Sequence, residues 1–130
     1  MKKTNPKLWG KLQAQLVPGE LKLDSATLEG HQGDKWFATG RPEAVALPRS
    51  SKAVSTILRF AHRHQIPVTP RGAGHGYVGG CVPLRGGIAL SVACMRRIKE
   101  IHEDDFVAVA QPGVITADLQ AKAEAKGLYY

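Results

Sequence analysis

The sequence predicts an α+β fold built around a β-α-β unit. Between residues 43 and 70, two short apolar runs flank a segment whose apolar residues recur at helical spacing. A glycine-dense loop separates this unit from a third apolar run, and a hairpin pattern and a helical pattern follow. The β-α-β order favours a parallel pair of strands joined by a right-handed crossover.

The first 40 residues predict a helical arm followed mainly by loop. Apolar residues recur at helical spacing until Pro18-Gly19 interrupts the pattern, at Leu8, Trp9, Leu12 and Leu16. Weak periodicity and several glycines predict loop over residues 20–40, with a short helix near residues 25–28.

The β-α-β unit has the clearest local signals in the chain. A strand is predicted over residues 43–47, where an apolar run ends at Pro48. Ser50-Ser51 can cap a helix over residues 51–64, in which Val54, Ile57, Leu58 and Ala61 share one face. The β-branched run at residues 66–70 predicts the second strand, with prolines only near its ends.

The C-terminal third predicts more strands and a last helix. Residues 87–92 predict a strand, and residues 98–102 and 106–110 predict a hairpin around a turn of acidic residues. Thr116 can cap a helix over residues 117–126, and Gly127 suits the position just past its end. Because the chain stops there, we expect it to be the front part of a larger protein.

Composition limits the class of protein. Of 130 residues, 43% are hydrophobic and 22% are charged, which fits a folded domain and argues against intrinsic disorder. No apolar run approaches the roughly 20 residues of a transmembrane helix, and no apolar stretch follows the basic N-terminus as in a secretory signal. Cys81 and Cys94 form no C-x-x-C pair and fit free thiols. We therefore expect a cytoplasmic protein; peripheral association with a membrane stays open.

The net charge of +7 indicates an anionic partner or a solvated basic face. Residues 41–71 carry six basic side chains against Glu43 alone. Nucleic acid, anionic lipid and phosphorylated ligands all suit such a segment. Because no aromatic residues interleave with the basic ones for base stacking, nucleic acid is not expected.

The glycine loop, residues 71–80, is the strongest candidate for a functional site. Half of its residues are glycine, which adopts positive φ at little cost and lets a ligand approach the backbone. Successive backbone N–H groups in such a loop can form a nest for phosphate, and Arg71 adds a permanent charge at its entrance. Composition fits equally a loop that is only structural.

Two phosphate-binding motifs do not apply to this loop. Residues 74–79 match G-x-G-x-x-G, but further glycines and Pro83 follow, so no helix can begin inside the motif as dinucleotide-binding folds require. A P-loop is excluded because no Gly-Lys-Ser/Thr ends the segment. Phosphate binding here would therefore depend on backbone N–H groups without a helix dipole.

Residues 41–130 resemble the start of the FAD-binding domain of FAD-linked oxidases, the domain shared by p-cresol methylhydroxylase and vanillyl-alcohol oxidase. The glycolate oxidase D-subunit and D-lactate dehydrogenase branch is the most similar. The order and spacing of several segments carry the resemblance: residues 41–45 with Pro48, 66–74, 79–83, 86–91, Met95, Ile98 and 112–114. Residues 20–40 match more loosely, with Gly33-Asp34 at a recurrent Gly-Asp position.

The resemblance implies two small α+β subdomains that enclose an extended FAD. The chain would then consist of an arm and loop (residues 1–40) and an incomplete FAD-binding domain (residues 41–130), containing the β-α-β subdomain and the beginning of the second. The implied cofactor residues are Pro70, Arg71, Gly72, Ala73, Gly74, His75, Gly76, Gly79, Gly80, Met95 and Gly113. With half of the cofactor's enclosure outside the chain, we expect weak FAD binding.

The implied function is FAD-dependent oxidation of a small 2-hydroxy acid by hydride transfer to the flavin. No catalytic base and no metal site is assigned, because the family's substrate domain lies beyond these residues. The alternative is a module that binds FAD or another anion without catalysis, or a truncated remnant of such an enzyme. His75 stands where a related branch has a histidine bonded covalently to the flavin; it could instead bind a phosphate without a covalent bond or face water.

Overall fold

A computed structural model describes residues 5–130, and its main sheet contains four strands. These are β1 (Leu21–Lys22), β2 (Ala44–Ala46), β3 (Val68–Arg71) and β4 (Ile88–Ser91), in the order β1-β2-β4-β3. β2 and β3 both run parallel to β4, and β1 is antiparallel to β2. The predicted parallel direction of β2 and β3 is therefore confirmed, but the two are not neighbours, since β4 lies between them.

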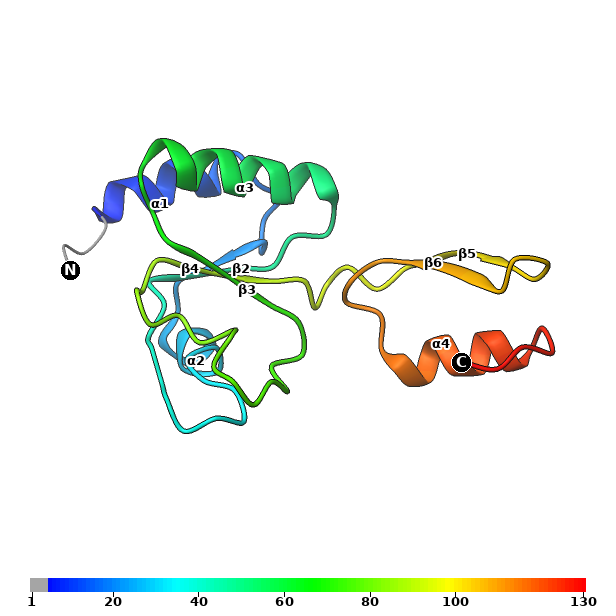
Figure 1. The fold of residues 1–130 in the computed structure, drawn as a ribbon. Helices are drawn as coiled ribbons and strands as arrows, with labels where there is room; N and C mark the ends of the chain where they lie inside the picture. The colour runs from blue at the N-terminus through cyan, green and yellow to red at the C-terminus, as the bar shows by residue number, and fades with distance from the viewer. Residues whose placement is uncertain (1–4) are drawn as a thin grey trace.

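Helices cover both faces of this sheet (Figure 1). α1 (Pro6–Gln13) and α3 (Ser51–Arg63) lie on one face, and the short α2 (Ser25–Glu29) lies on the other. Strand side chains alternate between the faces. Ile88 and Leu90 of β4 therefore join the larger cluster with Trp9, Leu12, Ile57 and Phe60, while Ala89 packs with Val45 and Leu28. All four residues of β4 are buried, as expected for a parallel strand covered on both sides.

Side-chain caps fix the start of each helix over this sheet. The Ser50 hydroxyl accepts the Ala53 N–H at 3.2 Å, so the predicted cap of α3 is confirmed. The Asp24 carboxylate accepts the Thr27 N–H at 3.0 Å at the start of α2. Hydrogen bonds from the backbone and the hydroxyl of Thr27 lower the pKa of Asp24, which keeps this cap ionised.

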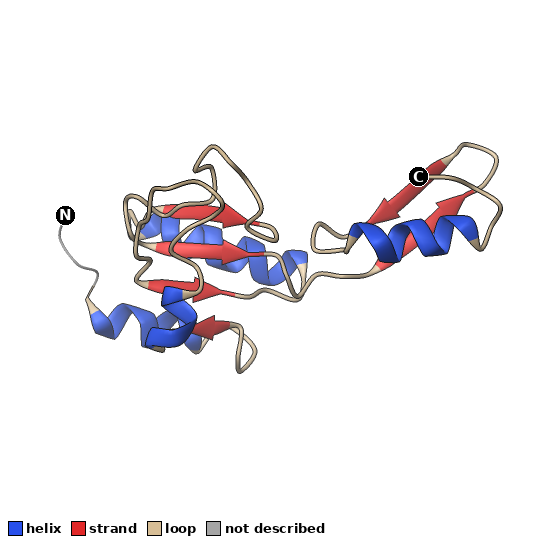
Figure 2. Cartoon of the chain, turned by 90° about the horizontal axis from the view of Figure 1, so that it is seen from below, coloured by secondary structure: helices blue, strands red, loops and turns tan. Residues whose placement is uncertain are grey.

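A second part of the chain follows β4 and consists of a hairpin and a helix (Figure 2). β5 (Ile98–His102) and β6 (Val107–Ala110) pair antiparallel, as predicted, and α4 (Thr116–Glu124) lies beside them. Thr116 is not the cap: the helix already begins at Thr116, so Ile115 takes the cap position, where its apolar side chain accepts no hydrogen bond and its carbonyl accepts the Asp118 and Leu119 N–H groups. Gly127 has a φ of 72°, in the left-handed region predicted for the end of this helix.

The remaining sequence expectations match the structure with small shifts of boundary. The short helix near residues 25–28 is confirmed as α2, whereas the two-residue strand β1 was not predicted. Helices of residues 5–130 are all too short or too polar to cross a membrane.

Substituting Ile57 tests how far the sheet depends on α3. Ile57 is completely buried, so Ile57→Ala should lower the free energy of unfolding by about 2–5 kcal/mol. Its neighbour Leu58 is 44% exposed, and Leu58→Ala should cost much less. Urea unfolding followed by circular dichroism measures both. Equal losses for the two variants would contradict the packing described here.

Candidate functional site

The glycine loop follows β3, and most of the loop's backbone N–H groups have no protein acceptor. Among residues 72–80, only the Gly79 N–H donates to a protein oxygen, the Asp34 Oδ2 at 3.2 Å. The N–H groups of residues 72–78 have no acceptor within residues 5–130, and most of this stretch is exposed. No helix begins in the loop, so the exclusion of a dinucleotide-binding helix is confirmed. A run of neighbouring N–H groups without protein acceptors can donate hydrogen bonds to a bound anion.

A cavity of about 430 Å³, here called the loop cavity, lies beside these amides. It is lined by residues from the glycine loop, from the connection after β4 and from the connection before α4: Gly72, Ala73, His75, Ala93, Arg96, Pro112, Gly113, Val114, Ile115 and Thr116. Because β3 and β4 are parallel, their carboxyl ends send both connections to the same edge of the sheet. Its volume is within the range of small-molecule sites.

The electrostatics of the loop cavity favour an anion. Among residues 5–130, Arg96 is the one charged residue that lines it, and its guanidinium is oriented by a hydrogen bond from Nε to the Ala93 carbonyl at 2.5 Å. The N-terminus of α4 also meets the cavity at Ile115 and Thr116. The Thr116 and Ala117 N–H groups at the start of α4 have no acceptor within residues 5–130, so they are left for water or a ligand.

A segment earlier in the chain, residues 33–36, supports the glycine loop and is here called the support segment. Asp34 accepts the Trp36 N–H through Oδ1 at 2.7 Å and the Gly79 N–H through Oδ2. The Lys35 N–H donates to the Gly76 carbonyl at 3.0 Å. Gly79 has a φ of 73°, and the Trp36 ring occupies the space that a Cβ would need. No other residue type fits Gly79 without strain.

Arg71 also belongs to this support. Its guanidinium donates to the Gly33 carbonyl at 2.5 Å, lies 3.6 Å from the Cys81 sulfur and fills the space where a Cβ of Gly74 would stand. Arg71 does not line the loop cavity. The Arg71 guanidinium therefore connects the loop to the support segment, and Arg96 is the guanidinium that lines the loop cavity.

The predicted site residues divide into two groups. Gly72, Ala73, His75 and Gly113 line the loop cavity together, although Gly113 is distant in sequence. The others do not line it: Pro70, Arg71, Gly74, Gly76, Gly79, Gly80 and Met95. Met95 is buried, and its carbonyl accepts the Gly113 N–H at 2.8 Å, so it supports the opposite wall.

Sequence reasoning missed Arg96 and Trp36 and gave Asp34 no role. A signal for Arg96 was present, because it lies in the connection that follows the strand predicted over residues 87–92. The family resemblance marks the Gly33-Asp34 position but assigns Asp34 no contact. Nothing local to Trp36 indicates that its ring packs on a glycine far along the chain.

Comparison with known proteins agrees with this geometry. A family model described as an FAD binding domain matches residues 42–130. The D-2-hydroxyglutarate dehydrogenase of Stutzerimonas stutzeri (strain A1501) is 38% identical over 129 residues, covering 98% of this chain and 28% of that protein. The glycolate oxidase subunit GlcD of Bacillus subtilis (strain 168) is 43% identical over 89 residues, 68% of this chain and 19% of that protein.

A solved structure of p-cresol methylhydroxylase with substrate bound superposes with a TM-score of 0.81 at 20% identity, over 94% of this chain and 25% of that one. This likeness confirms the expected fold. The chain spans about a quarter of the length of such relatives. Since the family model covers residues 42–130, the chain belongs to the FAD binding domain family.

Proposed function

We propose that the loop cavity and the glycine loop bind FAD, and that the chain is the cofactor-binding part of an oxidoreductase acting on 2-hydroxy acids. The observation that carries the proposal is the run of N–H groups at residues 72–78 that find no acceptor within residues 5–130, beside a cavity to which those residues contribute Arg96 and no acidic side chain. A diphosphate has the charge and the acceptor oxygens that such a site requires. The relatives named above support the substrate class.

Each part of the site has a distinct task in this proposal. The backbone N–H groups of residues 72–76 hold the diphosphate, and Arg96 adds a positive charge on the other side of the cavity. Arg71, Gly74, Gly76, Gly79 and Asp34 keep the loop in its open shape. Pro70 lies in β3 just before the loop, Gly80 ends the loop, and Met95 holds Gly113 at the cavity wall.

FAD held here would supply the acceptor for a hydride from the substrate carbon that bears the hydroxyl. The residues of this chain bind and orient it, and we assign none of them as a base. We further propose that residue 41 begins the cofactor domain, because the family model starts at residue 42, and that residues 33–36 support it. A cytoplasmic location is our expectation from the two free thiols.

The flavin of the protein that carries this chain should be reduced by a 2-hydroxy acid. Anaerobic addition of D-2-hydroxyglutarate, D-lactate or glycolate to the FAD-loaded protein should bleach the oxidised flavin absorbance with at least one of them. Propionate matches lactate but lacks the hydroxyl, so it should leave the spectrum unchanged. An FAD-loaded protein that no 2-hydroxy acid reduces would support the alternative of a binding module without catalysis.

Asp34→Asn should weaken FAD binding by about tenfold, measured by titration of flavin fluorescence. An amide side chain has only one acceptor oxygen, so it cannot replace both carboxylate oxygens that accept the Trp36 and Gly79 N–H groups. Losing one of these partly buried hydrogen bonds costs about 1–3 kcal/mol. Removing a negative charge would by itself strengthen binding of an anion, so weaker binding reports on the shape of the loop. Asp104→Asn removes the same charge in the exposed hairpin turn and should not weaken binding. Tighter binding by Asp34→Asn would overturn the supporting role.

Acid precipitation of the FAD-loaded protein should release the flavin into the supernatant. Covalent attachment requires an imidazole held against the flavin, but His75 is exposed and makes no hydrogen bond within residues 5–130. Yellow colour that stays in the washed pellet, and that His75→Ala removes, would establish the covalent bond instead.

A further inference from the structure

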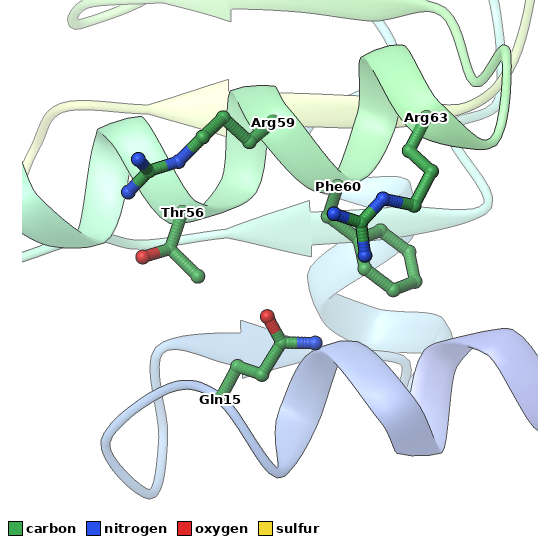
Figure 3. Close-up of a pocket in the computed structure, with 5 residues that line it drawn as sticks. All are labelled: Gln15, Thr56, Arg59, Phe60 and Arg63. Atoms are coloured by element: carbon green, nitrogen blue, oxygen red, sulfur yellow. The ribbon is translucent and has the colours of Figure 1, made fainter.

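A second cavity, of about 310 Å³, lies between the end of α1 and the outer side of α3 (Figure 3). Here called the arginine cleft, it is lined by Gln15, Thr56, Arg59, Phe60 and Arg63. Gln15 faces the α3 side chains across the gap in Figure 3. The arginine cleft shares no lining residue with the loop cavity, so it is a separate site.

Arg59 and Arg63 lie one helical turn apart, and neither is paired. Within residues 5–130, neither guanidinium makes an ion pair or a side-chain hydrogen bond. Like charges four residues apart on a helix destabilise it slightly. α3 has no acidic residue at all, although an acid in its first turn would favour the helix. A bound anion would relieve this repulsion.

The uncharged residues of the cleft add polar groups and a rigid floor. Gln15 Nε2 donates to the Lys11 carbonyl at 3.0 Å, which fixes the amide while leaving its second N–H available. The Thr56 hydroxyl donates to the Lys52 carbonyl at 3.1 Å. Phe60 is buried and its ring contacts His64, so the aromatic part of the lining is fixed.

The positive field extends beyond the cleft along α3. An adjoining cavity of about 360 Å³ shares Gln15 and Thr56 with it and adds Lys52, which lies on the same helix. Glu20 lines that second cavity, but it is buried and its carboxylate accepts the N–H groups of Val17 and Arg49 at 3.1 and 2.8 Å. Its acceptors are thus committed to the backbone, and basic side chains dominate the groove.

We infer that the arginine cleft binds a phosphate group, carried by a small soluble molecule or by a lipid headgroup. Two guanidiniums on one face offer several N–H donors to an anion with more than two acceptor oxygens. A cavity of this volume is at the lower end of the range for small ligands, which fits a phosphate with a compact attached group. In the part of the chain that the structure describes, Phe60 is the only aromatic residue of the lining, and it is buried, so stacking of nucleic-acid bases is disfavoured.

Titration of the ¹⁵N-labelled 130-residue chain with inorganic phosphate, followed by NMR, tests the inference site by site. The signals of residues 56–63 and of the Gln15 side chain should shift and saturate. They form a set separate from residues 72–78, where phosphate can also bind, so the two sites are read independently. If the signals near all basic residues shift in proportion to the phosphate concentration, and those of α3 do not saturate, the shifts report only general ionic attraction. That result would overturn the inference.

A charge-matched pair of double variants supplies the control. Arg59→Gln with Arg63→Gln should weaken the α3 response at least tenfold and leave the response of residues 72–78 in place. Lys99→Gln with Lys122→Gln removes the same charge from exposed positions on β5 and α4 and should leave the α3 response unchanged. Circular dichroism confirms that both variants fold. An unchanged α3 response in the arginine variant would refute the site.

Sedimentation with vesicles distinguishes the two sources of phosphate. Binding to phosphatidic acid vesicles but not to phosphatidylcholine vesicles, lost in the arginine variant and competed by inorganic phosphate, would assign a lipid headgroup. A saturable response to inorganic phosphate without vesicle binding would assign a soluble ligand.

Discussion

The carboxylate of Asp34 is the contact on which the site depends. Its two oxygens join the support segment to a position 45 residues later, through the N–H groups of Trp36 and Gly79. Arg71 holds the beginning of the same loop to Gly33. Because both ends are held by residues outside it, the stretch between them needs no internal hydrogen bonds. Its exposed N–H groups can bind water at little cost until a ligand replaces that water.

The position of β4 brings the other wall of the cavity to this loop. Central strands of parallel sheets are covered on both faces and therefore need apolar residues on both. All four residues of β4 are buried, as this position requires. Once β4 lies beside β3, the connections that follow the two strands begin at the same edge. Arg96 and Gly72 thereby reach one cavity, although the chain between them passes through the whole of β4. The cavity is therefore a product of strand order more than of any local motif.

The sequence could predict what local periodicity and turn chemistry determine. The apolar stripe of α3 and the acidic turn of the β5–β6 hairpin are both encoded within a dozen or so residues, and both were found. The place of β4 between β2 and β3 was not, because pairing of parallel strands depends on contacts distant in sequence. The packing of the Trp36 ring on Gly79 is another contact between distant residues, and no local pattern encodes it. Thr116 failed as a cap because helix ends shift by a residue without a change in pattern.

The basic segment at residues 41–71 shows why charge counted along a chain does not identify a binding face. Arg41 donates to the Ser25 hydroxyl at 3.0 Å and so connects the segment before β2 to the start of α2. Arg71 is used inside the glycine loop. Only Arg59 and Arg63, with Lys52 nearby, gather along one groove. One stretch of sequence thus supplies a structural contact on one side of the sheet and an unpaired cationic groove on the other, and burial and partners, not net charge, separate the two roles.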